Sequence, residues 1–129
     1  MEIPHNVVGW FEIPVIDMER AIRFYESVFG FSFSRNTMGP LDMAWFPGVE
    51  TGMGSAGSLV HYPAAYSPSA SGCLLYFTAF SGDVGIELSR VEPAGGKVLQ
   101  GRTQISEEVG YMGLFLDSEG NRFAIHSRK

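Results

Sequence analysis

The segment from Trp10 to Phe31 constrains the fold more than any other part of the sequence. In residues 10–16 large apolar side chains recur at every second position, as in a strand that buries one face. Asp17 then stands where a helix N-cap is expected, because its carboxylate can accept a free backbone N–H group. Apolar side chains follow at helical spacing, and Gly30 can adopt the left-handed conformation that ends many helices. The segment therefore predicts a strand, a capped helix and a second extended run that begins at Phe31.

The same order of elements returns in the second half of the chain. Gly30 lies thirteen residues after Asp17, and Gly96 lies thirteen residues after Asp83. An apolar run precedes each aspartate, and further extended runs follow each glycine. The predicted strands are residues 7–16, 31–35, 41–46 and 55–61 in the first half, and 73–80, 97–101, 109–116 and 122–126 in the second. Each half is therefore predicted to be a βαβββ unit.

The length indicates one domain in which these two units share a core. The chain has 129 residues, and a unit of about 60 residues buries too little surface to be comfortably stable alone. We predict a single α+β domain, residues 1–129, with module one at about 5–62, a Pro/Ser/Ala-rich linker at about 63–72 and module two at about 73–127. The polar stretch 103–110 is predicted to be a loop at the rim of the space between the modules.

Composition argues against two classes of partner. The formal charge is −5 and the nine basic residues are scattered, whereas nucleic-acid binding needs clustered Lys and Arg. There is no apolar run of about 18 residues, so no membrane span is expected. The first nine residues lack the features of a secretory signal, and a single cysteine, Cys73, fits a reducing compartment. These features predict a cytoplasmic protein.

Three short motifs give the chain a family resemblance. They are a strand–Asp–helix segment with Phe24, Tyr25, Phe29 and Gly30, the sequence AGGK at 94–97, and D-x-E-G-N at 117–121. Together with the paired βαβββ order, they resemble the vicinal oxygen chelate superfamily, which includes glyoxalase I, bleomycin-resistance proteins and extradiol dioxygenases. The resemblance covers about residues 7–127. It implies two modules that pair into a cup-shaped sheet or barrel, and it implies a homodimer.

The resemblance also implies four positions for ligands to a divalent metal, on the first and last strands of each module. Here these positions fall on Trp10, Leu59, Leu74 and Ala124. Indole and alkyl groups have no lone pair to offer a cation, so we expect neither this metal nor another cofactor. We therefore predict a glyoxalase/bleomycin-resistance-like protein of unassigned activity that binds a small organic molecule in an aromatic cleft. The candidate ligand-binding residues are Trp10, Glu12, Trp45, Tyr76 and Tyr111.

An alternative uses polar side chains two positions further along each strand. These are Glu12, His61, Tyr76 and His126, the candidate catalytic residues. A carboxylate and two imidazoles can bind Zn, Ni, Mn or Fe and can also transfer protons. The alternative is a metal-dependent lyase or dioxygenase of the glyoxalase type with one metal on Glu12, His61 and His126. Glu12 could instead have a structural partner, and an interaction module with a vestigial cleft is a third alternative, so the sequence leaves open whether the protein is an enzyme.

Overall fold

The computed structural model describes residues 2–129, which form eight strands and two helices. The first module contains β1 (Trp10–Pro14), α1 (Met18–Phe29), β2 (Ser34–Met38), β3 (Leu41–Trp45) and β4 (Ala56–His61). The second contains β5 (Tyr76–Thr78), α2 (Val84–Val91), β6 (Lys97–Ser106), β7 (Gly110–Leu116) and β8 (Arg122–Ser127). The predicted α+β class and the repeated βαβββ order are confirmed.

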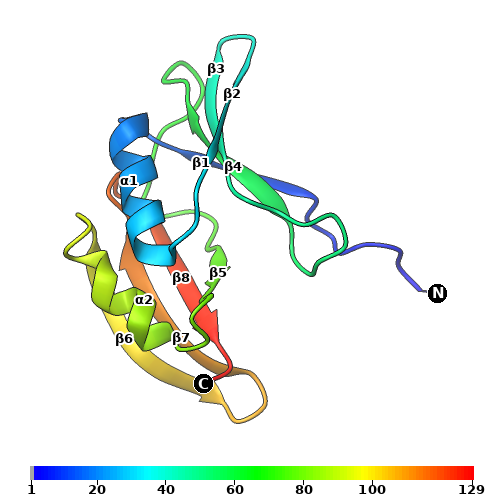
Figure 1. Ribbon diagram of the computed structural model, residues 1–129, viewed down its shortest axis with the longest axis vertical. Helices are drawn as coiled ribbons and strands as arrows, with labels where there is room; N and C mark the ends of the chain where they lie inside the picture. The colour runs from blue at the N-terminus through cyan, green and yellow to red at the C-terminus, as the bar shows by residue number, and fades with distance from the viewer. Residues whose placement is uncertain (1) are drawn as a thin grey trace.

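Each module contributes one four-stranded mixed sheet. The strand orders are β1-β4-β3-β2 and β5-β8-β7-β6, with β1 parallel to β4 and β5 parallel to β8. The strands described here form two separate sheets and no closed barrel, so of the two predicted forms the barrel is not found. The helices α1 and α2 pack against each other beside the two sheets (Figure 1).

The local signals in the sequence explain both helices. The Asp17 carboxylate accepts the backbone N–H of Arg20 at 3.1 Å, and Gly30 ends α1 with a φ of 81°. The Asp83 carboxylate caps α2 in the same way, through the N–H of Gly85 at 2.9 Å. Neither α1 nor α2 is long and apolar enough to cross a membrane, within the part of the chain that the structure describes.

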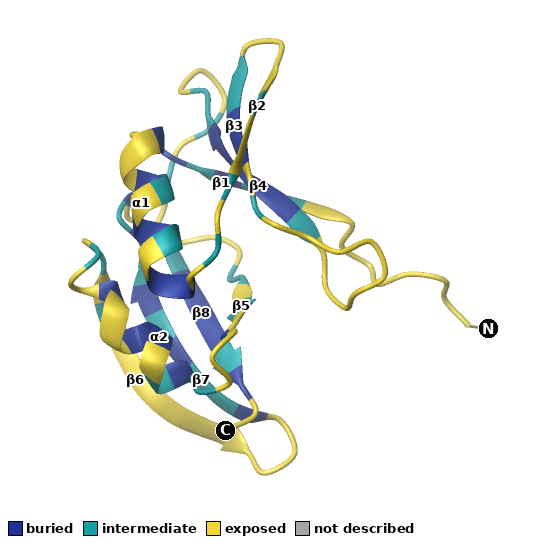
Figure 2. Ribbon diagram, viewed as in Figure 1, coloured by how far each residue is buried: buried dark blue, intermediate teal, exposed yellow. Residues whose placement is uncertain are grey.

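The core lies between the helices and one face of each sheet. Because side chains alternate along a strand, Ile13 and its cross-strand neighbour Leu59 point toward α1, whereas Glu12 and its neighbour Ser58 point the other way. We call these sides the helix face and the helix-free face of a sheet. Figure 2 shows buried residues concentrated in the central strands and in the inner sides of the helices, while β6 is exposed along most of its length.

The turn between β7 and β8 fastens the second module to the first. The Glu119 carboxylate accepts the backbone N–H groups of Ile16 and Asp17, both at 2.8 Å, and forms an ion pair with Arg20 at 2.8 Å. Burial alone would raise the pKa of Glu119, but the hydrogen bonds from Arg20 and these N–H groups lower it to about 2. Glu119 is therefore ionised at neutral pH and holds the start of α1.

A buried pair beside this contact extends the connection between the modules. The Tyr25 hydroxyl donates to the Asp117 carboxylate at 2.6 Å. Burial raises the pKa of both groups, and in Tyr25 the nearby negative charge of Asp117 adds to the effect. The side-chain amide of Asn121 donates to the carbonyl of Pro14 at 2.9 Å. Residues 117–121, the D-x-E-G-N motif of the sequence, thus hold β1 and α1 of the other module.

Several predicted boundaries were wrong. β1 covers only Trp10–Pro14 of the predicted residues 7–16. β2 begins at Ser34 rather than Phe31, and β5 is limited to Tyr76–Thr78. The predicted rim loop is wrong for residues 103–106, because β6 continues to Ser106 and its Thr103 pairs with Met112 in a long antiparallel hairpin.

Candidate functional site

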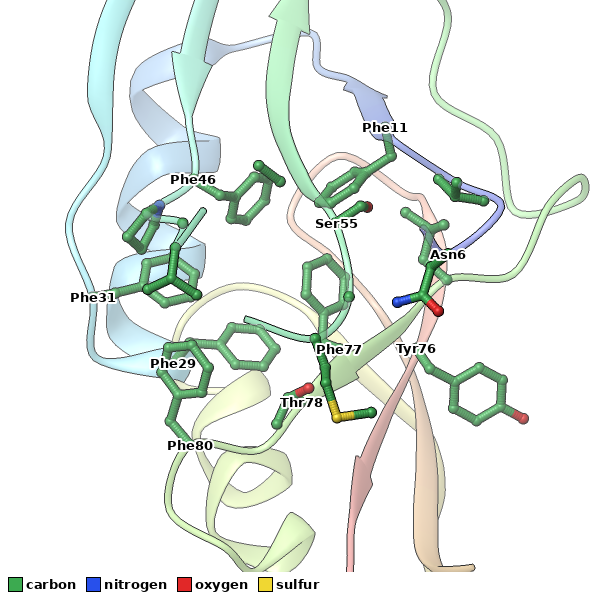
Figure 3. Close-up of a pocket in the computed structure, with 18 of the residues that line it drawn as sticks. Asn6, Phe11, Phe29, Phe31, Phe46, Ser55, Tyr76, Phe77, Thr78 and Phe80 are labelled. Atoms are coloured by element: carbon green, nitrogen blue, oxygen red, sulfur yellow. The ribbon is translucent and has the colours of Figure 1, made fainter. Parts of the chain in front are cut away.

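A pocket of about 780 Å³ opens where the two modules meet, beside β5 (Figure 3). Six of the ten phenylalanines in the chain line it: Phe11, Phe29, Phe31, Phe46, Phe77 and Phe80. In Figure 3 the rings of Phe29, Phe31 and Phe46 gather on one side, whereas Asn6 and Tyr76 lie on the other. The pocket therefore has an aromatic wall and a more polar side.

The end of α1 builds part of this wall. Phe29 is the last residue of α1, and the left-handed Gly30 turns the chain so that Phe31 follows immediately beside it. The two rings stack with centroids 5.7 Å apart and 8° between their planes. Phe31 also meets Phe80 of the second module edge-on, at 5.8 Å. The helix C-cap predicted from Gly30 thus positions two residues of the pocket.

A glycine under an aromatic ring sets the position of Phe11. Gly57 of β4 is the cross-strand partner of Phe11 on β1. A Cβ atom at Gly57 would lie only 2.5 Å from carbons of the Phe11 ring, so this ring lies directly over the glycine. From there it contacts Phe46 at 5.4 Å and Phe77 at 6.4 Å between ring centroids. Gly57 therefore allows the first sheet to present an aromatic ring at the junction of the modules.

The mouth of the pocket combines exposed apolar side chains with a few uncharged polar ones. Val7 in the N-terminal segment is 95% exposed, and Met53 in the β3–β4 loop is 99% exposed. Asn6, Ser55 and Thr78 add amide and hydroxyl groups to the lining. Apolar side chains gathered and exposed around a hollow are typical of binding sites.

Of the five ligand-binding residues predicted from the sequence, only Tyr76 belongs to this lining. Trp10 and Trp45 pack edge-to-face at 5.3 Å and share the helix-free face of the first sheet with Glu12. Glu12 accepts a hydrogen bond from Tyr66 of the linker at 2.5 Å, and this bond raises the pKa of the Tyr66 hydroxyl. Glu12 thus has a structural partner, one of the alternatives left open by the sequence.

The family comparison agrees with this architecture. The model of the Glyoxalase/Bleomycin resistance protein/Dioxygenase superfamily matches residues 7–125. The chain belongs to this superfamily. A search of the curated proteins found no match.

Solved structures show the same fold at low sequence identity. A glyoxalase I mutant from Zea mays has a TM-score of 0.71 and 18% identity over 93% of this chain, which spans 45% of the maize chain, about half its length. The hypothetical protein SA1046 from S. aureus has a TM-score of 0.68 and 22% identity, covering 95% of this chain and 94% of its own. TnmS3, an antibiotic binding protein from Streptomyces sp. CB03234, has a TM-score of 0.67 and 22% identity, covering 99% and 100%. At these identities the likeness concerns the fold alone.

In this superfamily member, the metal positions implied by the resemblance offer no suitable donor set. The expected position at Leu59 was wrong, because this fully buried side chain lies on the helix face, and the residue that faces Glu12 is Ser58. Ser58 Oγ is buried and has no hydrogen-bond partner in residues 2–129. Trp10 and Ala124 have no lone pair for a cation. These residues therefore do not fit a divalent metal.

The alternative set of Glu12, His61 and His126 is not assembled either. His61 pairs with Asp42 on the face opposite to Glu12, and its Nδ1 donates to the carbonyl of Val15 at 3.1 Å. His126 is in the second sheet, where its Nε2 donates to the carbonyl of Val109 at 2.5 Å. Throughout residues 2–129, no three His, Cys, Asp or Glu side chains lie close enough to hold a metal ion. The geometry gives no support to a shifted metal site.

Tyr111 also lies away from the pocket. Alternation along β7 places it on the same face as Phe115, which is the helix face of the second sheet. The guanidinium of Arg102 stacks on its ring, with the carbon atom 3.7 Å from the ring centroid. This cation–π contact is a structural role for Tyr111.

The phenylalanines of the pocket were missed because the sequence assigns them to the core. Phe11 and Phe29 occupy the apolar faces of a predicted strand and a predicted helix, which is the pattern of buried residues. One signal was present in the sequence: Phe29 and Phe31 flank Gly30, so aromatic side chains continue past the end of the helix. Such a continuation indicates an apolar surface beyond the helix.

Proposed function

We propose that the protein binds a small organic molecule in the phenylalanine-lined pocket. The observation that carries this proposal is the cavity itself, about 780 Å³ in volume, lined by six Phe and one Tyr. Ligand sites in proteins are commonly concave, largely apolar and about 300–1,000 Å³ in volume. A vestigial, filled cleft was the third alternative from the sequence, and an open cavity of this size argues against it.

The physical gain comes from removing aromatic surface from water. Each Å² of apolar surface that a guest covers contributes about 25 cal/mol, on the guest and on the wall alike. The stacked rings of Phe29 and Phe31 are fixed by packing, so a guest does not have to order them on binding. The printed description of TnmS3 as an antibiotic binding protein supports a binding role within this fold.

We propose further that binding uses no metal. The support is the donor set, because the four implied metal positions hold Trp10, Leu59, Leu74 and Ala124, and the helix-free face of the first sheet adds beside them the Glu12 carboxylate and the neutral Ser58 hydroxyl, which are too few donors for a divalent cation. Protein expressed with added Zn, Ni, Mn and Fe, and purified without chelator, should contain far less than one metal ion per chain by mass spectrometry. Near-stoichiometric metal would overturn this part of the proposal.

The binding proposal is tested by filling the pocket. Thr78 is exposed and lines the cavity, so Thr78→Trp would place an indole inside it with little cost to the fold. A thermal-shift screen of small aromatic compounds should give hits on the wild type that are lost in Thr78→Trp. The matched control is Thr37→Trp, an exposed strand position outside the lining, which should keep every hit. Hits that persist in Thr78→Trp, or no hits with the wild type, would refute the proposal.

A further inference from the structure

We propose that the ligand is an uncharged aromatic molecule with hydroxyl or carbonyl groups at one end. This inference rests on the proposed function and names the chemical class of its ligand. It follows from two features of the lining: it has no charged side chain, and it combines aromatic rings with amide and hydroxyl groups.

The lining of the pocket contains no charged side chain. Among the described residues, every lining side chain is apolar, aromatic, or an uncharged amide or hydroxyl, with no carboxylate, imidazole, amine or guanidinium. A charge that loses its water in such an environment has no partner to compensate it, and the cost is large compared with any apolar gain. An ionised group on the ligand would therefore have to stay outside the aromatic wall.

The electrostatic field at the wall disfavours anions in particular. α1 ends at Phe29, so the negative end of its helix dipole, about half an elementary charge, lies at the pocket. The last turn of α1 contains no basic residue to offset this charge. The formal charge of the whole chain, −5, acts in the same direction over longer distances.

A cation would gain from the aromatic rings but would find no carboxylate in the lining. Glu12 directly follows the wall residue Phe11, yet it points to the opposite face of β1 and is held by Tyr66. The polar groups present are those of Asn6, Ser55 and Thr78, which can donate to and accept from neutral oxygens. Asn6 lies across the pocket from Phe29, Phe31 and Phe46 in Figure 3, so the polar end of the ligand is expected on that side.

Two probes that differ by one sulfonate test the inference. N-phenylnaphthylamine is neutral, and anilinonaphthalene sulfonate has the same rings with an added negative charge. Fluorescence titration of the wild type should give the neutral probe at least about tenfold higher affinity, equal to about 1.4 kcal/mol. Equal or tighter binding of the sulfonate would overturn the inference and leave the binding proposal intact. If Thr78→Trp binds the neutral probe as well as the wild type does, both fail.

A second pair of probes and a charge variant complete the test. Acridine above its pKa is neutral, whereas N-methylacridinium is a permanent cation of nearly the same shape, and the neutral member should bind more tightly. Tighter binding of the cation would contradict the proposed class. Thr78→Lys places a positive charge in the lining and should reduce the preference for the neutral probe over the sulfonate severalfold. Thr37→Lys should leave that preference unchanged, and the same change in both variants would refute the assigned site.

Discussion

Replacing Glu119 with Gln should weaken the contact between the two modules and lower the free energy of unfolding. The Glu119 side chain is fully buried and accepts hydrogen bonds from the N–H groups of Ile16 and Asp17, from Arg20 and from the hydroxyl of Ser118. Both carboxylate oxygens are used in these contacts. A glutamine has only one acceptor oxygen. Placed at Oε1 it keeps the N–H groups of Ile16 and Asp17, but its NH₂ group then faces the Arg20 Nε–H, donor against donor, and the negative charge that pairs with Arg20 is lost.

The pKa of Glu119 sets the size of the effect. The ordinary pKa of 4.5 falls to about 2 in the folded protein, a difference worth about 3 kcal/mol of folding free energy at neutral pH. Because the partner Arg20 has a 46% exposed side chain, solvent screens part of this interaction. We therefore expect Glu119→Gln to lower the free energy of unfolding by about 2 kcal/mol at neutral pH.

The loss of stability in Glu119→Gln should depend on pH, because it comes from the ionised carboxylate of Glu119. The pKa of Glu119 is lower in the folded state, so its contribution is complete above about pH 5 and disappears as the pH falls toward about 2. Buried Asp117 has a raised pKa and acts in the opposite sense, but it is present in both proteins. The difference in stability between wild type and variant should therefore shrink steadily as the solution is acidified.

Urea denaturation followed by far-ultraviolet circular dichroism at several pH values provides the measurement. Glu107→Gln, in the exposed turn after β6, is the matched control and should change stability by less than about 0.5 kcal/mol. A Glu119→Gln difference that is equally small, or that stays constant between neutral and acidic pH, would refute this account of the contact between the modules.

Three further predictions follow from the packing around the pocket and from the superfamily resemblance. Gly57→Ala should cost about 1–3 kcal/mol in urea denaturation, because its Cβ would lie 2.5 Å from the Phe11 ring; an unchanged midpoint would contradict this. Trp10→Ala should leave the affinity for N-phenylnaphthylamine within about twofold, whereas Phe31→Ala should weaken it by about tenfold or more; the reverse order would place the site at Trp10, one of the residues predicted from the sequence. Light scattering should give twice the chain mass of 14.1 kDa, as the superfamily resemblance implies, and a mass of one chain would refute the homodimer.

The fold was predictable because its signals are local and occur twice. Asp17 and Asp83 cap their helices through their own side chains, and Gly30 ends α1 by its own backbone conformation. The edge strand β6 was partly missed because nearly all of its side chains are exposed. A polar strand without a buried face has the same sequence pattern as a loop.

The site was less predictable because it depends on register and on contact between the modules. The repeat alignment matched His61 with His126, but the strand pairing makes Val60, on the helix-free face, the counterpart of His126. A shift of one residue moves a side chain to the other face of a sheet, so His61 points away from Glu12. The pocket joins Phe29 of one module to Phe77 of the other, a proximity that no local pattern indicates.

The most direct test of the central claim is an NMR titration of the protein with labelled phenylalanine and tryptophan side chains, using N-phenylnaphthylamine as the probe. The account predicts that the largest shifts occur in the six phenylalanines of the pocket, with little change in the deeply buried Phe24 and Phe115 or in the indole signals of Trp10 and Trp45. Shifts concentrated in Trp10 and Trp45, with the pocket phenylalanines unchanged, would contradict it.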